Sequence, residues 1–565
     1  MNESDSDELF GAIRLDNIVS SEKLSKSSYQ LLLKGKYRLW SVKIELPNAF
    51  PFCLPKAYLL NTELIGTLPH VNQRGVICLE ESDSLLCDHY RGQQIIETFI
   101  IEIIKLLDRV SLDIYQDELL DELEGYYTPK YTVNSFYVPS TKVEHIPLKI
   151  YRYKKQLSPK HLMPLALLGE GVSTAFSNVE YLNQFQTINI LHLPLERAIL
   201  PPKGGDFLKS SYVEGLSNYL SETNRKRLAK LLDSIKPYFV FFILVSMPRS
   251  EGEQTQLLLK LTARNAANHP LKDAGNEWDV SYFSVVRNTN SFLAKRGGAL
   301  SELATKKVGI IGCGSVGGII ADALGKAGIG NLILVDPDLL LPENVYRHIL
   351  GGGALSYLPS EKVTNVKYLP KTHALFKHLT SELPKINVVP LCEEFSESLA
   401  REHLSGCDLI ISAVGAPSVN LAINATLKLI GYRHIIYCWN EAAGCGGHST
   451  AHDLNETCLE CLHRDNQGNF VPNRLSLIEP GQNISKSLTG CGGVFTPFSY
   501  LDSMKTAQMA ASQTVKVLLG KEANFAESWK GDASQPLALT QRYKKMSMMD
   551  HLEIKQSDSC GVCNE

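Results

Sequence analysis

Hydrophobic residues recur in short runs near the N-terminus of the chain and then at helical spacing. Residues 29–60 alternate between apolar and polar positions or form short apolar runs, which Pro47, Pro51 and Pro55 interrupt. This pattern is typical of a small antiparallel sheet. Residues 93–107 then repeat apolar side chains with the period of a helix: Ile95, Ile96, Phe99, Ile100, Ile103, Ile104 and Leu107. We therefore predict a compact α+β domain that ends near residue 130.

The middle of the chain mixes strand and helix patterns and contains no motif. Its predicted elements are two buried strands and one or two amphipathic helices: residues 187–193, 239–245 and 216–235. The longest apolar run, residues 238–247, lies between two prolines and is too short to span a bilayer. We predict an α/β linker domain over residues 131–290 and no membrane partner.

Strands and helices alternate from Lys306 onward. Short apolar strands are predicted in four places: residues 308–311, 332–335, 409–413 and 434–437. A glycine-rich turn and a helix that runs through Leu324 separate the first two of them. Alternation of this kind predicts a mostly parallel, doubly wound, Rossmann-like sheet. The predicted fold is thus multidomain α/β, with domains at residues 1–130, 131–290 and 291–565.

Composition limits the classes of partner. Lys and Arg total 57 against 60 Asp and Glu, and the net charge of -3 argues against nucleic acid or an anionic membrane as the main partner. The N-terminus is acidic and polar, where a signal peptide would be basic and then apolar. With 13 cysteines and no secretion signal, we expect a cytoplasmic protein whose thiols are metal ligands, nucleophiles or core residues rather than disulfides.

A glycine-rich loop follows the first C-terminal strand. Gly312, Gly314 and Gly317 form a G-x-G-x-x-G run that opens a helix, where the tight backbone and the helix N-terminus favour a bound phosphate. Asp336 ends the next predicted strand, where a carboxylate can bond a ribose hydroxyl. This combination indicates a nucleotide, and by itself it also fits the nicotinamide or flavin cofactor of an oxidoreductase.

Basic residues after this loop favour phosphate chemistry. Arg347 and Lys362 follow Asp336, together with Asn344. A hydride-transfer enzyme does not need two cations at its phosphates, whereas acyl-adenylate formation builds negative charge on the α-phosphate and on pyrophosphate. Arginine can clamp a phosphate through two hydrogen bonds, and lysine acts as a point charge. The pattern therefore favours an ATP-dependent adenylating enzyme.

Three runs in this region, GIIGCGSVGG, LVDPDLLLPENVYRH and SEKV, resemble the ubiquitin-activating, ThiF/MoeB-like adenylation superfamily. The resemblance extends from about Lys306 to the C-terminus and implies ATP and magnesium as cofactors. It implies a site in which Asp336 binds the ribose and other residues surround the phosphates: Gly312, Gly314, Gly317, Asp338, Asn344, Arg347 and Lys362. Arg296 resembles the arginine that these enzymes lend across a homodimer interface, and a solvated linker charge is the alternative reading.

One position departs from the family pattern. Family members place a magnesium-binding aspartate after the strand that here begins at Asp408, and Gly415 stands in that place. Either another carboxylate, such as Asp338, holds the metal, or adenylation is weakened. We expect retained activity because the arginine and lysine set is complete. A non-catalytic scaffold is the alternative.

Cysteines near the C-terminus carry further candidate chemistry. Two C-x-x-C pairs have the spacing of a tetrathiolate zinc site: Cys458, Cys461, Cys560 and Cys563. The second pair resembles the closing zinc knuckle of the same superfamily. Cys491, in TGCGGVFTP, lies where the superfamily often carries its thioester cysteine. Its glycine-flanked loop before a predicted helix favours Cys491 over the rival Cys445.

The N-terminal domain contains a second candidate nucleophile. The turn His70-Val71-Asn72 is followed by Cys78, six residues after the asparagine. With the proline-punctuated sheet, this resembles the ubiquitin-conjugating fold over residues 28–127, with Val71 in place of the usual proline. The resemblance implies that Cys78 carries a thioester and that Asn72 donates an N–H to the oxyanion formed when an amine attacks. His70 is expected to support the loop.

An activating and a conjugating module on one chain resemble the bacterial conjugation enzymes associated with CD-NTases in CBASS anti-phage defence. The resemblance implies a homodimer that uses ATP to activate the C-terminal carboxylate of a cGAS-like nucleotidyltransferase. It also implies that the acyl group passes from Cys491 to Cys78 and then to lysine amines of target proteins. The main rival is a ThiF/MoeB-type adenylyltransferase for a sulfur-carrier protein, which needs no conjugating domain.

Overall fold

The structure is a computed structural model that describes most of the chain. The described residues are 9–65, 68–72, 74–79, 87–112, 118, 132–151, 163–168, 186–199, 210–249, 254–273, 277–355, 368–383, 386–465, 467–487 and 494–564. The chain divides into two compact units, and the second begins at Asn290. Among the described helices, none is both long enough and apolar enough to cross a membrane.

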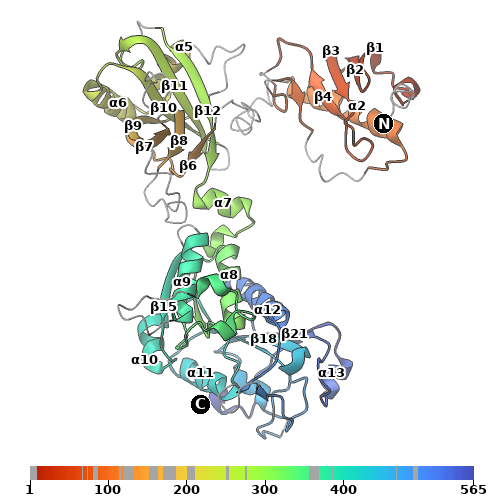
Figure 1. The fold of residues 1–565 in the computed structure, drawn as a ribbon, viewed down its shortest axis with the longest axis vertical. Helices are drawn as coiled ribbons and strands as arrows, with labels where there is room; N and C mark the ends of the chain where they lie inside the picture. The colour runs from red at the N-terminus through yellow and green to blue at the C-terminus, as the bar shows by residue number, and fades with distance from the viewer. Residues whose placement is uncertain are drawn as a thin grey trace. The chain divides into compact units, whose positions relative to one another are not determined.

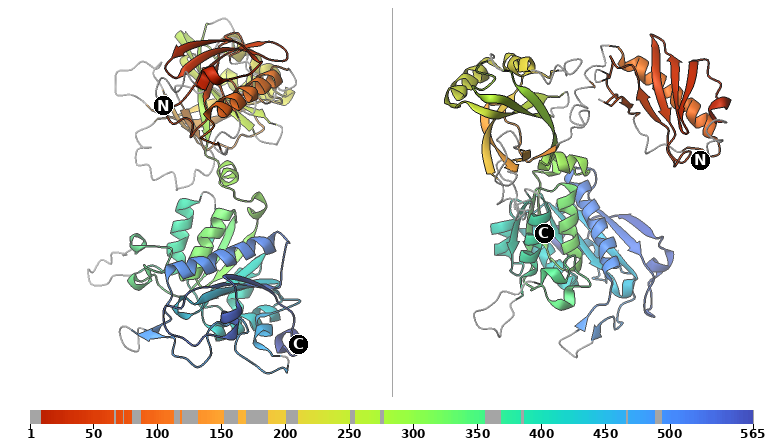
Figure 2. Two further views of the ribbon diagram at one scale, coloured as in Figure 1. Left: turned by 90° about the vertical axis from the view of Figure 1, so that its right-hand side faces the viewer. Right: turned by 45° about the horizontal axis from the view of Figure 1, so that its top comes forward.

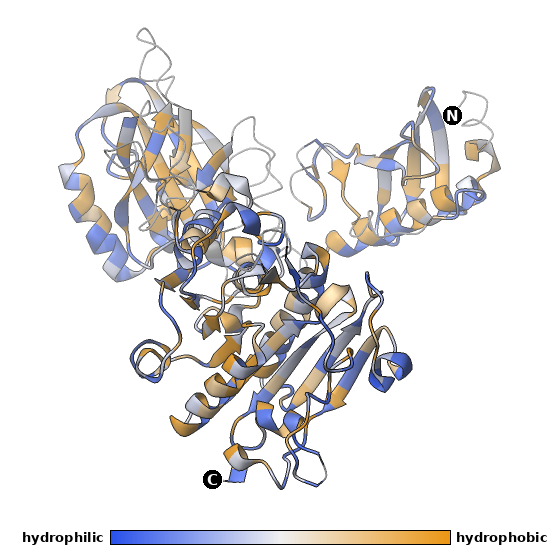
Figure 3. Ribbon diagram, turned by 60° about the horizontal axis from the view of Figure 1, so that its bottom comes forward, coloured by the Kyte–Doolittle hydropathy of each residue, from blue (hydrophilic) through white to orange (hydrophobic). Residues whose placement is uncertain are grey.

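The first unit begins with a five-stranded antiparallel sheet (Figure 1). Its strands are hydrogen-bonded in chain order: β1 (Ile18–Ser25), β2 (Ser28–Lys34), β3 (Leu39–Glu45), β4 (Lys56–Leu59) and β5 (Val76–Ile77). Helix α2 (Gly92–Val110) buries one face against the core that these strands form, with Ile96, Ile100 and Ile103 fully covered. In Figure 3, α2 carries both hydrophobic and hydrophilic residues, as an amphipathic helix does. The sheet and the helix predicted from the sequence are confirmed.

A buried carboxylate fixes the end of α2 to the sheet. Asp108 accepts a hydrogen bond from the indole Nε1 of Trp40 at 2.8 Å and another from the backbone N of Lys36 at 2.6 Å. Lys36 lies in the β2–β3 turn and Trp40 is the second residue of β3, so the last turn of α2 has a defined position relative to the sheet. A buried charge that accepts two hydrogen bonds avoids most of its desolvation cost.

The first unit also contains a closed barrel of seven strands. The strands lie in the order β10–β11–β12–β6–β8–β7–β9, and β9 pairs with β10 to close the barrel. Their bounds are β6 (Thr132–Ser135), β7 (Glu144–Tyr151), β8 (Met163–Leu167), β9 (Gln186–Pro194), β10 (Tyr238–Pro248), β11 (Gln254–Ala267) and β12 (Asp279–Arg287). Three helical segments accompany them: α5 (Ser210–Gly215), η5 (Leu216–Tyr219) and α6 (Glu222–Ser234).

Strand β10 explains the longest apolar run of the sequence. Phe242 and Leu244 belong to a buried cluster to which all seven strands contribute, the interior of the barrel. Ile243 and Val245 point to the opposite side and belong to a second cluster that includes Leu228 of α6. A strand that is buried on both faces has no polar alternation. The sequence predicted the strands and helices of this region, but not the closure, which depends on pairing between distant strands.

The second unit is built on an eight-stranded mixed sheet with the order β15–β14–β13–β16–β17–β18–β21–β22 (Figure 1). The first five strands run parallel: β13 (Lys307–Ile311), β14 (Asn331–Val335), β15 (Asn387–Leu391), β16 (Leu409–Ser412) and β17 (His434–Asn440). Three antiparallel strands extend the sheet: β18 (Gly446–Asp453), β21 (Phe525–Lys530) and β22 (Met549–Glu553). The predicted parallel part is confirmed, and the antiparallel extension was not predicted.

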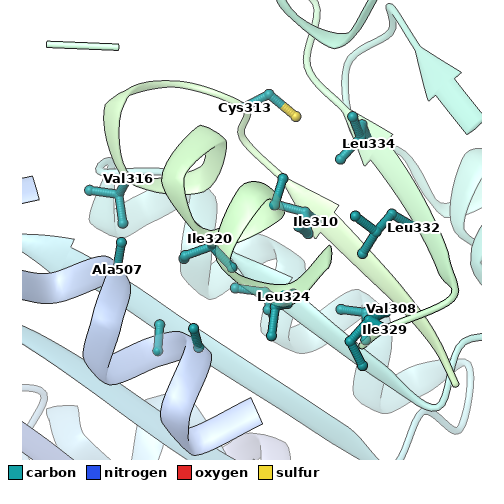
Figure 4. Close-up of a cluster of buried hydrophobic side chains, with 14 of the residues drawn as sticks. Val308, Ile310, Cys313, Val316, Ile320, Leu324, Ile329, Leu332, Leu334 and Ala507 are labelled. Carbon is teal, nitrogen blue, oxygen red and sulfur yellow. The ribbon is translucent and has the colours of Figure 1, made fainter. Parts of the chain in front are cut away.

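Helices cover both faces of this sheet. Their bounds are α7 (Asn290–Arg296), α8 (Ser315–Ala327), α9 (Lys371–Glu382), α10 (Glu397–Leu399), α11 (Pro417–Leu429), α12 (Tyr500–Leu518), α13 (Gln541–Lys545) and α14 (Gly561–Asn564). Helix α12 packs beside α8 and against β17 and β18 (Figure 2). Val308 and Ile310 of β13 pack with Ile320 of α8 and Ala507 of α12 (Figure 4). On the other face, Ile311 contributes to the core that includes α11, so the unit is doubly wound.

Candidate functional site

The glycine loop lies where the strand order of the parallel sheet reverses. The loop follows β13, which has β14 on one side in the sheet and β16 on the other. Gly312 has φ 87°, and a Cβ there would lie 3.1 Å from the backbone of Ala413, at the end of β16. A Cβ on Gly317 would lie only 1.8 Å from the carbonyl oxygen of Gly312. Both positions therefore require glycine, and they place the loop in the crevice where doubly wound sheets bind ligands.

Asp336 fixes this loop from the next strand. Its Oδ2 accepts a hydrogen bond from the backbone N of Cys313 at 2.7 Å, and its Oδ1 accepts one from the backbone N of Asp338 at 2.8 Å. The residue is buried, with 6% of its surface exposed, directly after β14. Asp338 lies two residues further along, and its side chain is largely exposed. The two carboxylates therefore flank the crevice beside the glycine loop.

A lysine that the sequence analysis missed completes this cluster. Lys371 is the first residue of α9, and its Nζ lies 2.6 Å from Oδ2 of Asp338 and 3.9 Å from Oδ1 of Asp336. Only 11% of its side chain is exposed, so the ammonium group is held in the crevice rather than in solvent. The signal for it is Pro370-Lys371 at the start of an amphipathic helix. The predicted phosphate lysine, Lys362, lies outside the described residues.

The side chain of His348 is hydrogen-bonded to the backbone of the glycine loop. Its Nδ1 accepts a hydrogen bond from the backbone N of Leu350 at 3.1 Å, so the ring donates through Nε2 to the carbonyl oxygen of Cys313 at 2.8 Å. Burial lowers the pKa of His348, which keeps the ring neutral in this role. Burial likewise raises the pKa of the Cys313 thiol. Cys313 is thus a core residue (Figure 4) and not a nucleophile.

Asn344 and Arg347 lie in the segment after β14. The Asn344 Oδ1 accepts a hydrogen bond from the backbone N of Leu341 at 2.9 Å, which leaves its Nδ2 group as the donor. The Arg347 guanidinium lies over two aromatic rings, 5.8 Å from the centroid of Phe495 and 5.3 Å from that of Phe498. Cation–π contacts of this kind orient an arginine without using all of its N–H donors.

Two further predicted positions are exposed. Arg296 is the exposed last residue of α7. Gly415 follows β16, and a Cβ built there meets nothing within 4 Å. A larger side chain would therefore fit at position 415 without a clash. Among the described residues, the acidic groups that reach the glycine loop and Lys371 are Asp336 and Asp338.

Cys491 lies outside the described residues, but the strands that flank it are described. Strand β19 (Lys486–Ser487) pairs antiparallel with β20 (Val494–Phe495), so residues 488–493 connect the two strands of a hairpin. The segment after β20 is held by a hydrogen bond from the backbone N of Ala443 to the carbonyl oxygen of Pro497 at 2.7 Å. Phe495, the last residue of β20, lies beneath the Arg347 guanidinium, so the hairpin lies beside the segment that follows β14.

The rival thiol, Cys445, is fully buried. Burial, together with the carboxylate of Glu441, raises its pKa to about 12. A thiol acts as a nucleophile through its thiolate, and at neutral pH this side chain is protonated and inaccessible. The structure therefore disfavours Cys445 as a thioester carrier.

Four cysteines of the second unit lie close together. Cys458 and Cys461 flank the start of η11 (Leu459–His463), and Cys560 and Cys563 lie at α14. Their four sulfur atoms lie within 4.8 Å of one another, with separations of 4.0 Å (458–461), 3.5 Å (458–560) and 3.7 Å (461–563). Zn–S bonds of about 2.3 Å in a tetrahedron imply sulfur separations of about 3.8 Å. The four thiols could hold a metal ion without rearrangement.

Cys78 lies in a different setting, directly after the edge strand β5, and it is exposed. Val71 and Ile77 form a β-bridge, and both side chains are buried. Asn72 is half-buried and follows Val71, and Cys78 follows Ile77, so both residues adjoin the bridged pair. The bridge therefore brings the backbones of these two predicted residues near one another.

The side chain of Asn72 is oriented by its own turn. Its Oδ1 accepts hydrogen bonds from the backbone N of Arg74 at 2.9 Å and from that of Val76 at 3.1 Å. With the carbonyl oxygen used in this way, the Nδ2 group is the part of the amide that remains to donate to a ligand. This is the group that an oxyanion would require.

The fold and the nucleotide crevice define the class of the second unit. Residues 286–561 match the model of the ThiF family, so this part of the chain is a ThiF-family domain. The resemblance to ThiF/MoeB-like adenylation enzymes that the sequence indicated is confirmed.

Individual proteins with similar sequences are also known. The chain is 29% identical over 294 residues to the ATP-dependent ubiquitin transferase-like protein Cap2 of Pseudomonas aeruginosa, over 49% of this chain and 47% of that protein. It is 24% identical over 231 residues to the Cap2 protein of Escherichia coli, over 39% and 36%. The sulfur carrier protein ThiS adenylyltransferase of Escherichia coli is 25% identical over 264 residues, which are 46% of this chain and 87% of that protein. The chain spans less than half the length of these Cap2 proteins.

Proposed function

We propose that this chain activates the C-terminal carboxylate of a polypeptide with ATP and conjugates it to amines through two of its own cysteines. The ThiF-family domain and relatives named ATP-dependent ubiquitin transferase-like proteins support this class of reaction. The polypeptide proposed is a cGAS-like nucleotidyltransferase of a CBASS anti-phage system, and the acceptors are lysine amines of other proteins. These partners follow from the family resemblance.

In the first step the carboxylate attacks the α-phosphate of ATP and pyrophosphate leaves. The backbone N–H groups of the Gly312 loop and the N-terminus of α8 favour the phosphates, and Asp336 binds the ribose. Lys371, Arg347 and Lys362 stabilise the charge that develops on the leaving pyrophosphate. Magnesium, when bound, would neutralise phosphate charge, and Asp338 is the exposed carboxylate that could hold it.

In the second step the Cys491 thiolate attacks the acyl-adenylate, so that a thioester forms and AMP leaves. Phe495 lies four positions after Cys491, and a chain of that length spans at most about 14 Å. Because Phe495 contacts Arg347, this reach supports Cys491 as the first acyl carrier. The buried Cys445 offers no comparable access.

In the third step Cys78 takes the acyl group from Cys491, and an amine then attacks the Cys78 thioester. Asn72 is proposed to donate through Nδ2 to the oxyanion that forms on the carbonyl oxygen, a role for which one donor is typically worth about 10²–10³ in rate. The observation that carries the proposal is the exposed Cys78, whose backbone N bonds the turn that contains an asparagine with its Oδ1 already occupied. A sulfur-carrier adenylyltransferase needs neither feature.

Trapping tests the relay directly. The protein is incubated with ATP and a candidate polypeptide, separated on a non-reducing gel and analysed by mass spectrometry. We expect thiol-labile adducts on both Cys491 and Cys78. A protein that forms acyl-adenylate but never carries an adduct on either sulfur would contradict the proposal.

We further propose a homodimer in which Arg296 of each subunit approaches the nucleotide of the other. Its exposed position at the end of α7 is consistent with contact to a second subunit. Mass photometry of the purified protein measures the oligomeric state.

The second candidate function is adenylation of a sulfur-carrier protein. The observation in its favour is the match to the ThiS adenylyltransferase, in which nearly the whole of that protein aligns with less than half of this chain. In that case the C-terminal domain alone would perform the reaction, and loss of Cys78 would leave the product unchanged.

Replacing Cys445 with alanine is expected to leave the yield of the first thioester within about twofold of the unaltered protein, because a buried thiol with a raised pKa does not react. Thioester formation is measured on non-reducing gels after incubation with ATP and polypeptide. Cys491→Ala serves as the contrasting variant and should lose the adduct. A folded Cys445→Ala protein without adduct would assign the thioester to Cys445.

We propose that the ion held by Cys458, Cys461, Cys560 and Cys563 is zinc, which joins the C-terminal residues to the η11 segment. Elemental analysis is expected to find one zinc per chain. Cys560→Ala should lose this zinc and lower the melting temperature by about 10 °C or more, since structural zinc contributes several kcal/mol to folding. Cys87→Ser, a half-buried cysteine outside the cluster, is the control. Unchanged zinc content in Cys560→Ala would exclude this site.

A further inference from the structure

Glu118 joins the end of helix α2 to the loop that precedes Cys78. Its Oε1 lies 2.6 Å from Nη1 of Arg109, in the last turn of α2, and its Oε2 lies 3.2 Å from Nε2 of His70. One carboxylate thus contacts two residues that are distant in sequence. The carboxylate bridges a guanidinium and an imidazole, one through each oxygen, and the bond to the guanidinium is charge-assisted.

His70 is the residue that this carboxylate holds. Its backbone has φ 60°, in the left-handed region that side-chain-bearing residues seldom adopt, and 8% of its surface is exposed. Its carbonyl oxygen accepts the hydrogen bond from the backbone N of Cys78 at 2.8 Å. A change in the backbone conformation of His70 would therefore move the carbonyl oxygen to which the backbone N of Cys78 is bonded. A residue in this conformation persists only when its surroundings fix it.

The same residue begins the turn that orients Asn72. His70 precedes Val71, whose β-bridge with Ile77 keeps the two strands in register. The contacts therefore form a continuous path from Arg109 through Glu118 and His70 to the backbone of Cys78. Helix α2 is anchored to the sheet by Asp108 beside Arg109, so the path starts from a rigid element.

We propose that Glu118 is a positioning residue for Cys78: it fixes the His70 ring, and through it the backbone that sets the distance between the Cys78 sulfur and the Asn72 amide. The role in acyl transfer rests on the proposed function of Cys78, whereas the role in placing the thiol does not. Glu118 lies 40 residues after Cys78 in the sequence and belongs to no motif near it.

An ordinary surface ion pair on the same helix gives the contrast. Glu102 and Lys105 pair at 2.7 Å on the exposed face of α2, with side chains 48% and 66% exposed. Such pairs contribute little to stability or to the position of other residues. Glu118 differs because its partner His70 is buried, and the backbone carbonyl oxygen of His70 accepts a hydrogen bond from the backbone N of Cys78.

The test is a double-mutant cycle of Glu118→Ala and His70→Ala in the full chain, with Glu102→Ala as the matched control. Two rates are measured: alkylation of Cys78 by iodoacetamide, followed by mass spectrometry, and discharge of the Cys78 thioester to free lysine. We expect Glu118→Ala to lower the rate constant for discharge about 10- to 100-fold, with the KM for lysine unchanged. In the His70→Ala background, Glu118→Ala should change either rate by less than twofold.

Glu118→Gln keeps the shape of the side chain but can accept from only one of its two partners, so an intermediate loss is expected. It also keeps the test valid if Glu118→Ala melts at a lower temperature than the control. In ¹⁵N spectra, the Nε2 resonance of His70 should shift in Glu118→Gln and not in Glu102→Ala, a signature that a purely structural role elsewhere would not produce.

Two results would overturn the proposal: rates in Glu118→Ala equal to those of Glu102→Ala, or full additivity with His70→Ala. The measurement of Cys78 alkylation by iodoacetamide requires no acyl group on the thiol. A cycle that holds for alkylation in a protein that never forms a Cys78 thioester would therefore keep the positioning role and remove the proposed function instead.

Discussion

Replacing Cys78 with alanine is expected to abolish final conjugates while the thioester on Cys491 still forms. In the proposed relay, adenylation and the first thioester depend on the ThiF-family domain, whereas Cys78 is an exposed residue of the N-terminal sheet domain. Without an acceptor thiol, the acyl group on Cys491 can only hydrolyse or return to the adenylate. Reactions are followed with ATP and polypeptide on reducing gels for conjugates and on non-reducing gels for thioesters.

The size of this effect comes from the loss of the nucleophile itself, so conjugate formation should fall below detection rather than by a small factor. Cys53→Ala, at a half-buried cysteine of the same domain, is the matched control and should conjugate normally. Conjugates that survive in Cys78→Ala would exclude Cys78 from the relay. Loss of the Cys491 adduct in the same variant would show that the two steps are not separate.

Lys371→Met should lower adenylation about 10²–10³-fold, measured as polypeptide-dependent exchange of pyrophosphate into ATP. The ammonium group lies in the crevice beside Asp336 and Asp338, where the triphosphate is proposed to bind. In the proposed reaction it supplies a positive charge where negative charge builds up on the leaving pyrophosphate. Methionine keeps much of the side-chain volume and removes only the charge.

A melting curve accompanies this measurement, because the loss of Lys371 leaves two carboxylates without their cation. Lys326→Met, at an exposed lysine of α8 that pairs with Asp322, is the control and should exchange pyrophosphate normally. Lys362→Met tests the other lysine proposed to stabilise the phosphate charge. Full activity in a folded Lys371→Met protein, with loss of activity in Lys362→Met, would return the phosphate role to Lys362.

The nucleotide loop could be predicted because its chemistry is local. The glycine spacing after an apolar strand requires neighbouring residues only, and the structure shows Gly312 at a positive φ and Gly317 where a Cβ would clash. Asp336 was found for the same reason, as the residue at the end of the next strand. The lysine was different: Lys371 enters the crevice because of the point at which α9 begins, and that point depends on how the chain returns to the sheet.

The antiparallel extension of the C-terminal sheet could not be predicted from hydrophobicity. Strand β18 is buried along its whole length, yet it contains His448, Ser449 and Thr450. These side chains are satisfied inside the core: His448 bonds Ser528 at 2.8 Å, and Ser449 bonds Gln513 at 2.5 Å. A strand whose polar groups find buried partners shows no apolar run in the sequence.

Burial separated two cysteines that the sequence presents in similar surroundings. Cys445 and Cys491 are both flanked by glycines, and only the fold shows that Cys445 is enclosed, with its pKa raised by burial. In the same way, the sequence placed Asn72 near Cys78, but only the fold shows that Val71 pairs with Ile77 and that Cys78 is exposed.

The sequence by itself therefore determined the glycine loop, the two C-x-x-C pairs, the H-x-N turn before Cys78 and the alternation that produces a doubly wound sheet, because each is a relation between residues close together in the chain. The tertiary structure alone decided that four sulfurs from two distant pairs meet, that Lys371 faces Asp336 and Asp338, and that Glu118 reaches His70. Those contacts join residues separated by tens of positions, and their distances depend on how helices and strands pack.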